Sequence, residues 1–180
     1  MMKKLLSLLT ISAFAASAFA QVYKTSTGTV DFISVTPAEN IEAKSSKVKA
    51  AIDSKSGAVQ FAISVNSFLF SKSLMQKHFQ EKYMETTKHP KSTFSGKITD
   101  LTKVTWGTDG TYSVSVKGNL KMHGVTKSVT IPGKIIIKDG KPTLDASFSV
   151  EPSDYKIKIP SAVKDKIAKS VTINVNCKCN

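Results

Sequence analysis

The sequence predicts a single all-β domain over residues 21–180, an antiparallel barrel of roughly eight strands with one or two short helices. Three observations lead to this prediction. Apolar and polar side chains alternate repeatedly, turn signals separate the alternating segments, and the length suffices for one domain with a core. Residues 71–85 and 161–168 interrupt the strand pattern, and we expect them to be helical.

Five segments carry the alternation clearly. Val59, Phe61 and Ile63, for example, are separated by Gln60 and Ala62. Because successive side chains of a strand point to opposite faces, such a segment has one apolar and one polar face. A sheet that is dry on one side only is typical of antiparallel strands. The clear segments are 58–66, 112–120, 128–135, 144–150 and 171–177, and weaker ones lie near 28–35, 46–53, 92–99 and 155–159.

Short turn signals lie between these segments. Residues 53–57, Asp109-Gly110 and Asp139-Gly140 supply the glycines that tight turns favour, and residues 123–126 are expected to form a hairpin tip. About eight strands with short links favour a barrel or a sandwich. Closure into a barrel removes exposed sheet edges, which favours the barrel.

The longer predicted helix, 71–85, is identified by an apolar stripe at helical spacing. Ser71 or Ser73 is expected to cap its start. After Pro160, residues 161–168 predict a shorter helical turn. The stripe of the first helix consists of Met75, Phe79 and Tyr83.

The N-terminal residues predict export. Lys3 and Lys4 precede an uncharged apolar run, and Ala18-Phe19-Ala20 fits the small-x-small pattern of a signal-peptidase site. The run of about 15 residues is shorter than the roughly 20 needed to span a bilayer, which disfavours an uncleaved anchor. We therefore expect residues 1–20 to be a cleaved signal peptide and residues 21–180 to be a periplasmic domain.

The predicted mature domain is strongly basic. The chain has a formal net charge of +13, and Lys3 and Lys4 account for two of these charges, so +11 remains after cleavage. The lysines are scattered along the chain, which favours a solvated basic surface over a dedicated polyanion site. Export argues against nucleic acid as a partner. Peripheral contact with an anionic membrane or an envelope polymer stays open.

The spacing of the titratable residues does not indicate an active site or a metal site. His78, His89 and His123 are not in close ligand spacing, and no serine elbow, phosphate loop or cysteine nucleophile motif occurs. An enzyme would have to use His78 and His89, with Glu81 and Glu85 nearby in sequence. We expect no catalytic residue, no metal ligand and no cofactor.

Two cysteines form a C-x-C pair near the C-terminus, Cys177 and Cys179. In an oxidising compartment they could bond each other, bond another chain or stay free. A bridge between residues two apart in a strand is near the geometric limit, and two thiols supply too few ligands for a metal. Their role stays open at this stage.

The pattern alone does not distinguish a packed barrel from a hollow one. A barrel of eight strands can fill its interior with side chains or hold one small ligand. The expected inward set mixes small residues, Gly118, Gly133 and Ala146, with large ones such as Phe61 and Phe148. Small inward residues would leave room, whereas the helix at 71–85 could plug it.

Several segments, taken in order, resemble the YceI-like proteins, a family of exported bacterial domains with a lipocalin-like barrel. The resemblance covers essentially the whole of residues 21–180, and the helical segment is most similar to short forms from Bacteroidetes-type bacteria. The segments are Thr29–Ser34, Ser67–Phe70, Leu74–Phe79, Tyr83–Glu85, His89–Phe94, Gly118–Lys127 and Phe148–Tyr155.

The resemblance implies an elongated barrel around an apolar channel that binds a long amphiphile. Polyisoprenoids, isoprenoid quinones and fatty acids are the implied ligand classes. Separately from the resemblance, we expect a monomer or a homodimer. Alternation and resemblance together predict the lining. Met75 and Met84 are lid candidates because methionine adapts to irregular apolar shapes, and ordinary packing of the helix on the barrel stays open as the alternative for both. The predicted lining is Phe32, Phe61, Ile63, Val65, Phe68, Met75, Phe79, Met84, Phe94, Val114, Val116, Leu120, Ile131, Ile135 and Phe148.

Two rival hypotheses remain beside this lipid carrier. The first is an interaction protein with a packed barrel, whose basic surface binds anionic membrane or envelope polymers. The second is an enzyme that acts on a lipid or a glycan. Ionic strength distinguishes the first from the carrier, because screening weakens surface charge pairs but not a buried apolar ligand.

Overall fold

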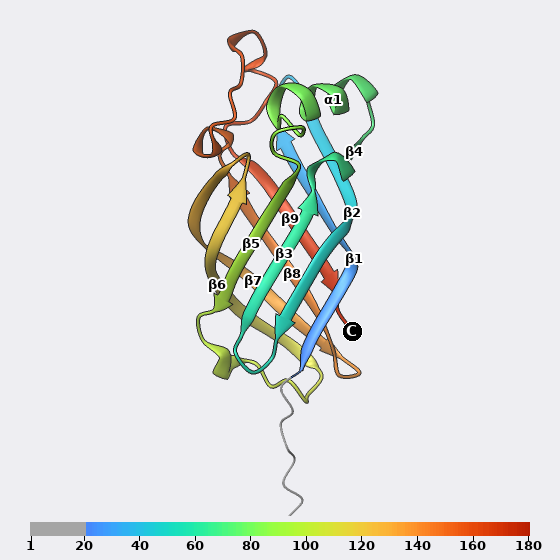
Figure 1. Cartoon of the computed structure of the whole chain (residues 1–180), viewed down its shortest axis with the longest axis vertical. Coiled ribbons are helices and arrows are strands. Elements are labelled where there is room, and N and C mark those ends of the chain that lie inside the picture. The colour runs from blue at the N-terminus through green and yellow to red at the C-terminus, as the bar shows by residue number, and fades with distance from the viewer. Residues whose placement is uncertain (1–20) are drawn as a thin grey trace, which may run out of the picture.

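Eight antiparallel strands close into an elongated barrel in the computed structural model (Figure 1), which describes residues 21–180. The predicted signal peptide lies outside the described residues. No helix within residues 21–180 has the length and hydropathy needed to cross a bilayer. The strands are β1 (Val22–Val35), β2 (Asn40–Asp53), β3 (Ala58–Ser64), β4 (Leu69–Phe70), β5 (Lys91–Ile98), β6 (Gly110–Met122), β7 (Val125–Lys138), β8 (Lys141–Val150) and β9 (Val171–Lys178).

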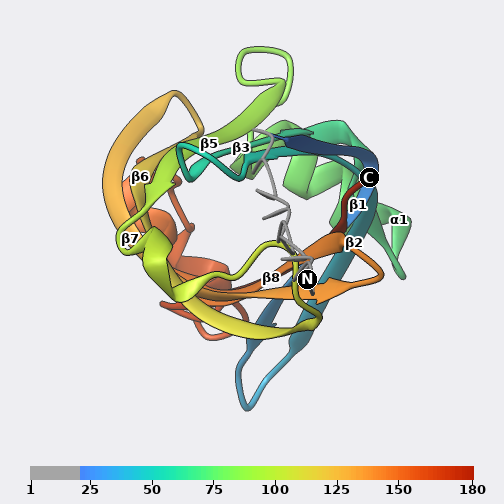
Figure 2. The same cartoon turned by 90° about the horizontal axis from the view of Figure 1, so that it is seen from below.

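The barrel closes because β1 pairs on both sides, with β9 and with β2. The order around the ring is β1-β9-β8-β7-β6-β5-β3-β2, and every neighbouring pair is antiparallel. Figure 2 shows this ring from below. The two-residue strand β4 lies outside the ring order and pairs with β2 at Ala43 and Lys44, beyond the stretch that β3 covers. The predicted closed barrel is therefore confirmed.

The alternation in the sequence corresponds to the two faces of the barrel wall. On β7, Ile131, Ile135 and Ile137 are buried, whereas Lys134 and Lys138 are exposed. The same pattern places Val59 and Val114 inside on β3 and β6. Inward burial of these side chains supplies the hydrophobic stabilisation, and the neighbouring strands satisfy the backbone polar groups.

Two of the turns are two-residue hairpins with positive φ at both central residues. His123 and Gly124 have φ values of 50° and 76°, and Asp139 and Gly140 have values of 51° and 70°. This is the type I′ geometry that suits the twist of paired strands. Asp109-Gly110, also predicted as a turn, does not form a two-residue hairpin. Asp109 is the last residue of a longer connection, residues 99–109, between β5 and β6, and Gly110 begins β6.

The predicted helix at 71–85 is present but shorter and irregular. Helix α1 spans Ser73–His78 and continues as a π-helical turn over Phe79–Tyr83. Neither predicted serine caps it, because Lys72 occupies the N-cap and makes no side-chain capping bond. We call residues 68–84, which include β4 and α1, the lid segment.

The second predicted helix, 161–168, is reduced to a single 3₁₀ turn at Ser161–Val163. A short segment gains little from helix formation because nucleation is unfavourable. A tertiary contact takes its place, since the amide of Ala168 donates to the hydroxyl of Ser34, 2.8 Å away. Residues 151–170 form an irregular loop with short 3₁₀ turns. This loop lies at the same end of the barrel as α1 (Figure 1).

Two glycines face each other where β5 meets β6. Gly96 and Gly118 are register partners, and the ring of Phe94 covers them. A methyl group on Gly118 would overlap the carbonyl oxygen of Ser95 and lie 2.5 Å from the Cα of Gly96. The room that we expected Gly118 to leave is therefore filled by Phe94, which corrects that prediction.

Gly118→Ala is expected to lower the free energy of unfolding by about 1–3 kcal/mol, because the added methyl group meets backbone rather than a flexible side chain. Urea unfolding at equilibrium measures this change. Gly107→Ala is the matched control, since a methyl group there meets nothing within 4 Å. Equal midpoints for wild type and Gly118→Ala would contradict the close approach.

Both cysteines are buried and free, and they belong to the same core cluster as Tyr23 and Ile137. Cys177 is 0% exposed and Cys179 is 1% exposed. The sulfur of Cys177 lies where a side chain on Gly28 would have to be. Burial raises the pKa of Cys177 to about 12 and that of Cys179 to about 11. Of the alternatives left open by the sequence, the structure supports free thiols that act as small apolar core residues.

The native protein should therefore resist alkylation at pH 8. The thiolate is the reactive species, and pKa values of about 11 and 12 leave ~10⁻³ of each thiol or less ionised, against ~10⁻¹ at the ordinary value of 9.0. Intact-mass spectrometry after iodoacetamide treatment should show labelling at least ~100-fold slower than in urea, rising as the pH approaches 11. Rapid double labelling of the folded protein would contradict this burial.

Candidate functional site

The barrel encloses one large apolar cavity with a volume of about 580 Å³. This size lies within the range of roughly 300–1,000 Å³ that is typical of small-molecule sites. All eight barrel strands contribute to its wall, together with the lid segment and the loop at 151–170. The cavity answers the question that the sequence left open, because the interior is hollow.

Packed side chains close the cavity at one end, which we call the floor. Tyr23 and Trp106 stack there with ring centroids 5.9 Å apart, beside buried Val104 and Ile137. None of these four residues lines the cavity. Trp106 and Val104 belong to the connection between β5 and β6, at the end of the barrel opposite α1 (Figure 1).

The other end of the cavity, which we call the mouth, lies beside the lid segment. The lining reaches solvent there through Leu74, which is 62% exposed, and Lys72, whose side chain is 65% exposed. Figure 1 shows α1 and the loop at 151–170 around this end. The cavity is thus a tube with one closed end and one end that lies beneath the short helix α1.

All fifteen residues predicted to line the site lie on the wall of this cavity. The strands contribute ten of them, and the segment between β3 and β5 contributes Val65, Phe68, Met75, Phe79 and Met84. Gly133 and Ala146 also lie on the wall, so the room expected at those two positions is present. That these residues contact a ligand stays a prediction.

Four aromatic rings hold the lid segment against β1. Phe79 lies 5.3 Å from Phe32 and 5.1 Å from Phe70, measured between ring centroids. Phe68 lies 5.4 Å from Phe32 and 5.8 Å from Phe79. Because Phe32, Phe68 and Phe79 also line the cavity, the contacts that close the lid are made by the same surfaces that would contact a ligand.

A small polar group lies at the mouth. Lys72 donates to Glu39 over 2.9 Å, and Lys166 lies near enough to act on the same carboxylate. The hydrogen bond from Lys72, with its charge, lowers the pKa of Glu39 below its ordinary value, so Glu39 is ionised at neutral pH. Two lysines and one carboxylate leave a net positive charge at the mouth.

Several lining residues were not predicted from the sequence. Glu39 and Lys72 are 33 residues apart, and no local pattern reports their contact. Ile157 and Ile159 line the cavity from the loop at 151–170 without forming a strand. The weak alternation noted near 155–159 was a usable signal for these two isoleucines, because it marked the side chains that share a face.

The titratable residues group differently from the pair suggested by the sequence. Glu85, His89 and His123 bring one ligand atom each within 4.8 Å of one another, and these three residues could hold a metal ion. His78 and Glu81, which the enzyme hypothesis required, are not in this group. The group lies next to Met84 but outside the cavity lining.

Three solved structures share this fold. A polyisoprenoid binding domain from Saccharophagus degradans superposes with a TM-score of 0.76 at 15% identity, covering 90% of this chain and 99% of that one. BcnA from Burkholderia cenocepacia gives 0.68 at 18% identity, with coverages of 83% and 94%. A YCEI protein from Campylobacter jejuni gives 0.54 at 16% identity, with coverages of 100% and 92%.

Comparison with curated proteins finds no significant match in sequence. The sequence profile of the YceI-like domain matches residues 10–179, nearly the whole chain. This match confirms the resemblance noted from the sequence, whereas the similarity to Bacteroidetes-type forms stays a prediction. With the closed antiparallel barrel and the shared fold of the three structures, the profile shows that the chain belongs to the YceI-like domain family.

Proposed function

We propose that this protein is an exported, periplasmic carrier that holds a long apolar amphiphile of the isoprenoid class in its barrel. The observation that carries the proposal is the apolar cavity of about 580 Å³, with a packed floor and a polar mouth. Family membership supports it, as does the fold shared with a structure described as a polyisoprenoid binding domain.

The chemistry of the cavity suits a long hydrocarbon. Burial of apolar surface contributes about 25 cal/mol per Å² and needs no directional partner, so a wall of aliphatic and aromatic side chains is sufficient. The polar head of the amphiphile would stay at the mouth. Lys72 and Lys166 favour a head group that carries negative charge or accepts hydrogen bonds.

The hollow interior favours this carrier over the alternative of a packed barrel that acts only through its surface. A fatty acid would use the same features, with its carboxylate near Lys72 and its chain in the tube. The proposal does not require a catalytic residue, because binding and release by the cavity are the whole function.

Blocking the tube should abolish lipid binding. Val116→Trp places an indole in the cavity, and we expect the purified variant to lose at least ~10-fold of its bound lipid, because the added volume displaces the chain. The measurement is lipid mass spectrometry on an organic extract of protein purified without detergent from its native envelope.

Lys117→Trp is the matched control, since Lys117 is the next residue on β6 and its side chain is exposed. The control should carry the same lipid as wild type in the same amount. The proposal fails if wild-type protein yields no lipid and takes up none when a polyprenol is offered. Equal lipid in wild type and Val116→Trp would exclude Val116 from the binding surface.

A membrane-docking role is favoured by a separate observation at the mouth. Val35, Leu69 and Leu74 are 62%, 67% and 62% exposed, and all three belong to elements at the α1 end (Figure 1). Exposed apolar side chains beside lysines are typical of surfaces that contact anionic membranes. We infer that the mouth docks on an anionic bilayer, where lipid can enter the tube without crossing water.

Leu69→Ser combined with Leu74→Ser should weaken binding to vesicles that contain anionic lipid, because two inserted side chains are lost. Co-sedimentation measures the bound fraction, and we expect a decrease of about 10-fold or more. Val22→Ser is the control, because Val22 is 49% exposed at the opposite end of β1. Vesicle binding should also fall with added salt, whereas lipid inside the barrel should stay bound. Equal binding by the double variant would place the contact elsewhere.

A further inference from the structure

A cluster of three possible metal ligands joins separate loops near the mouth. Glu85 follows the lid segment, His89 precedes β5, and His123 stands at the tip of the hairpin between β6 and β7. One ligand atom from each residue lies within 4.8 Å of the other two. Nothing in the proposed lipid binding uses these residues, because none of them lines the cavity.

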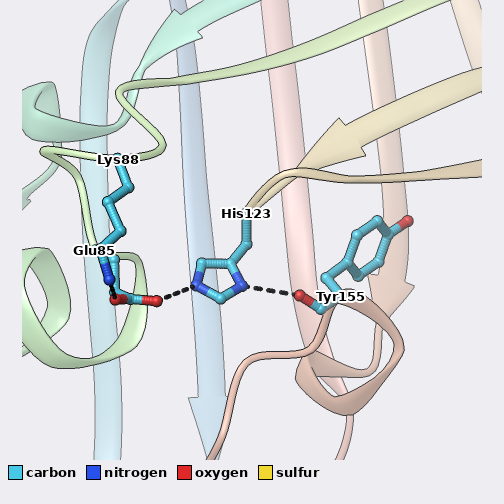
Figure 3. A network of polar contacts seen from close by, with 4 residues as sticks. All are labelled: Glu85, Lys88, His123 and Tyr155. Atoms are coloured by element: carbon cyan, nitrogen blue, oxygen red, sulfur yellow. Dashed lines mark hydrogen bonds and ion pairs between the residues drawn. The ribbon is translucent and has the colours of Figure 1, made fainter.

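A hydrogen bond to the backbone fixes the orientation of the His123 ring. Its Nδ1 lies 2.9 Å from the carbonyl oxygen of Tyr155, and since a carbonyl only accepts, Nδ1 must carry the proton (Figure 3). A hydrogen bond from one ring nitrogen to a backbone carbonyl is the usual support of a metal-binding imidazole. The side chain of His123 is only 9% exposed, so the ring is held firmly.

This orientation points the other nitrogen of His123 at a carboxylate. Nε2 lies 3.3 Å from Oε2 of Glu85 (Figure 3). With the proton on Nδ1, the neutral ring presents a lone pair at Nε2, and a carboxylate oxygen also presents lone pairs. Two acceptors face each other at this distance only when a cation, either a proton or a metal ion, lies between them.

The spacing matches a shared metal ion. Two ligands of a tetrahedral zinc ion, each bonded at about 2.0–2.1 Å, lie about 3.3–3.4 Å apart. The 3.3 Å between Glu85 and His123 already has this value. His89 needs to approach by at most about 1.5 Å, which a side-chain torsion can supply.

The backbone around the cluster brings the ligands together. Glu85 and His123 both have positive φ, 43° and 50°, a conformation that non-glycine residues adopt uncommonly. Gly124 lets the ring of His89 lie against the hairpin tip, because a methyl group there would stand 2.7 Å from the Cε1 of His89. The rings of His89 and His123 meet edge to face, with centroids 4.7 Å apart.

The carboxylate of Glu85 has one oxygen for each of two partners. Lys88 bonds Oε1 over 2.6 Å, which leaves Oε2 for the cluster. Lys88 is 69% exposed, so solvent screens its charge from the cluster.

We propose that Glu85, His89 and His123 form a three-ligand site for a divalent metal ion of the zinc type, with a fourth position open to water. Two imidazoles with one carboxylate suit zinc, cobalt, nickel or copper better than magnesium or calcium, which prefer oxygen ligands alone. The bound ion would tie the end of the lid segment to the β6–β7 hairpin and, through His123, to Tyr155 in the loop at 151–170. This site stands independently of the proposed lipid cargo.

Cobalt titration of the untagged protein, residues 21–180, tests the site. Co²⁺ reports three nitrogen and oxygen ligands plus water by its visible absorption, and Zn²⁺ should displace it at a stoichiometry of one ion per chain. His89→Ala and Glu85→Gln should each raise the dissociation constant at least ~10-fold, because each removes one of three ligands.

Two controls separate this site from others in the chain. His78→Ala removes a histidine outside the cluster and should bind Co²⁺ as wild type does. Replacement of Cys177 and Cys179 by alanine should also leave binding unchanged. Circular dichroism verifies that each variant is folded. His89→Ala and Glu85→Gln are preferred over a change at His123, because the His123 side chain is only 9% exposed and is hydrogen-bonded to the backbone of Tyr155.

Zn²⁺ should also raise the thermal midpoint of wild type and of His78→Ala, but not that of Glu85→Gln, since binding to the folded state alone stabilises it. The proposal is overturned if wild-type protein binds neither Co²⁺ nor Zn²⁺ at micromolar concentrations. It is equally overturned if affinity survives both His89→Ala and Glu85→Gln.

Discussion

Closure of the barrel by β1 is the constraint on which the rest of the structure depends. Because β1 pairs with both β2 and β9, the ring is closed and every barrel strand has a hydrogen-bonded neighbour on each side. The wall is therefore held by its own backbone, and it does not need a packed interior to keep its shape. An open sheet with the same apolar face would have to collapse onto another layer. Closure therefore allows the centre to stay hollow, because the wall does not depend on a packed interior.

The two ends of the closed barrel differ in what fills them. At the floor, Tyr23 and Trp106 fill the interior, so that end behaves as an ordinary core. At the mouth, Phe32 and Phe79 join the lid segment to β1, and the cavity separates the lid from the far wall. A ligand of the proposed carrier would contact the lid segment and the far wall at once, so its binding would stabilise both. In that carrier, the mouth is the part of the barrel where binding and stability are coupled.

The sequence predicts the wall well because period two decides which side chains point inward. Val114 and Ile135 could be assigned to the interior from their neighbours alone, without knowledge of the register. The contents of the interior could not be predicted in this way. Gly118 was expected to leave room, yet Phe94 on the adjacent strand fills it, and only the pairing of β5 with β6 reveals this.

Contacts between loops were the least predictable part of the site. The ion pair of Glu39 with Lys72, and the approach of His123 to Glu85, each join residues more than thirty positions apart in irregular segments. Periodicity carries no information about such pairs. One local signal was present at residues 123–124. The type I′ turn needs its glycine, but it does not need a histidine at the preceding position, so His123 could be singled out as a residue with another role.

The closed floor has a consequence for traffic through the barrel. A tube with one opening cannot pass cargo from end to end, so the tail of the proposed amphiphile would enter first and leave last, with its head group facing outward. Loading and unloading are then the same path in opposite directions. The structure itself gives no preferred direction of transfer, and net movement follows the difference in chemical potential between the donor and the acceptor. In the proposed carrier, the depth of the tube would set how much of a chain is hidden, and a longer chain would protrude from the mouth.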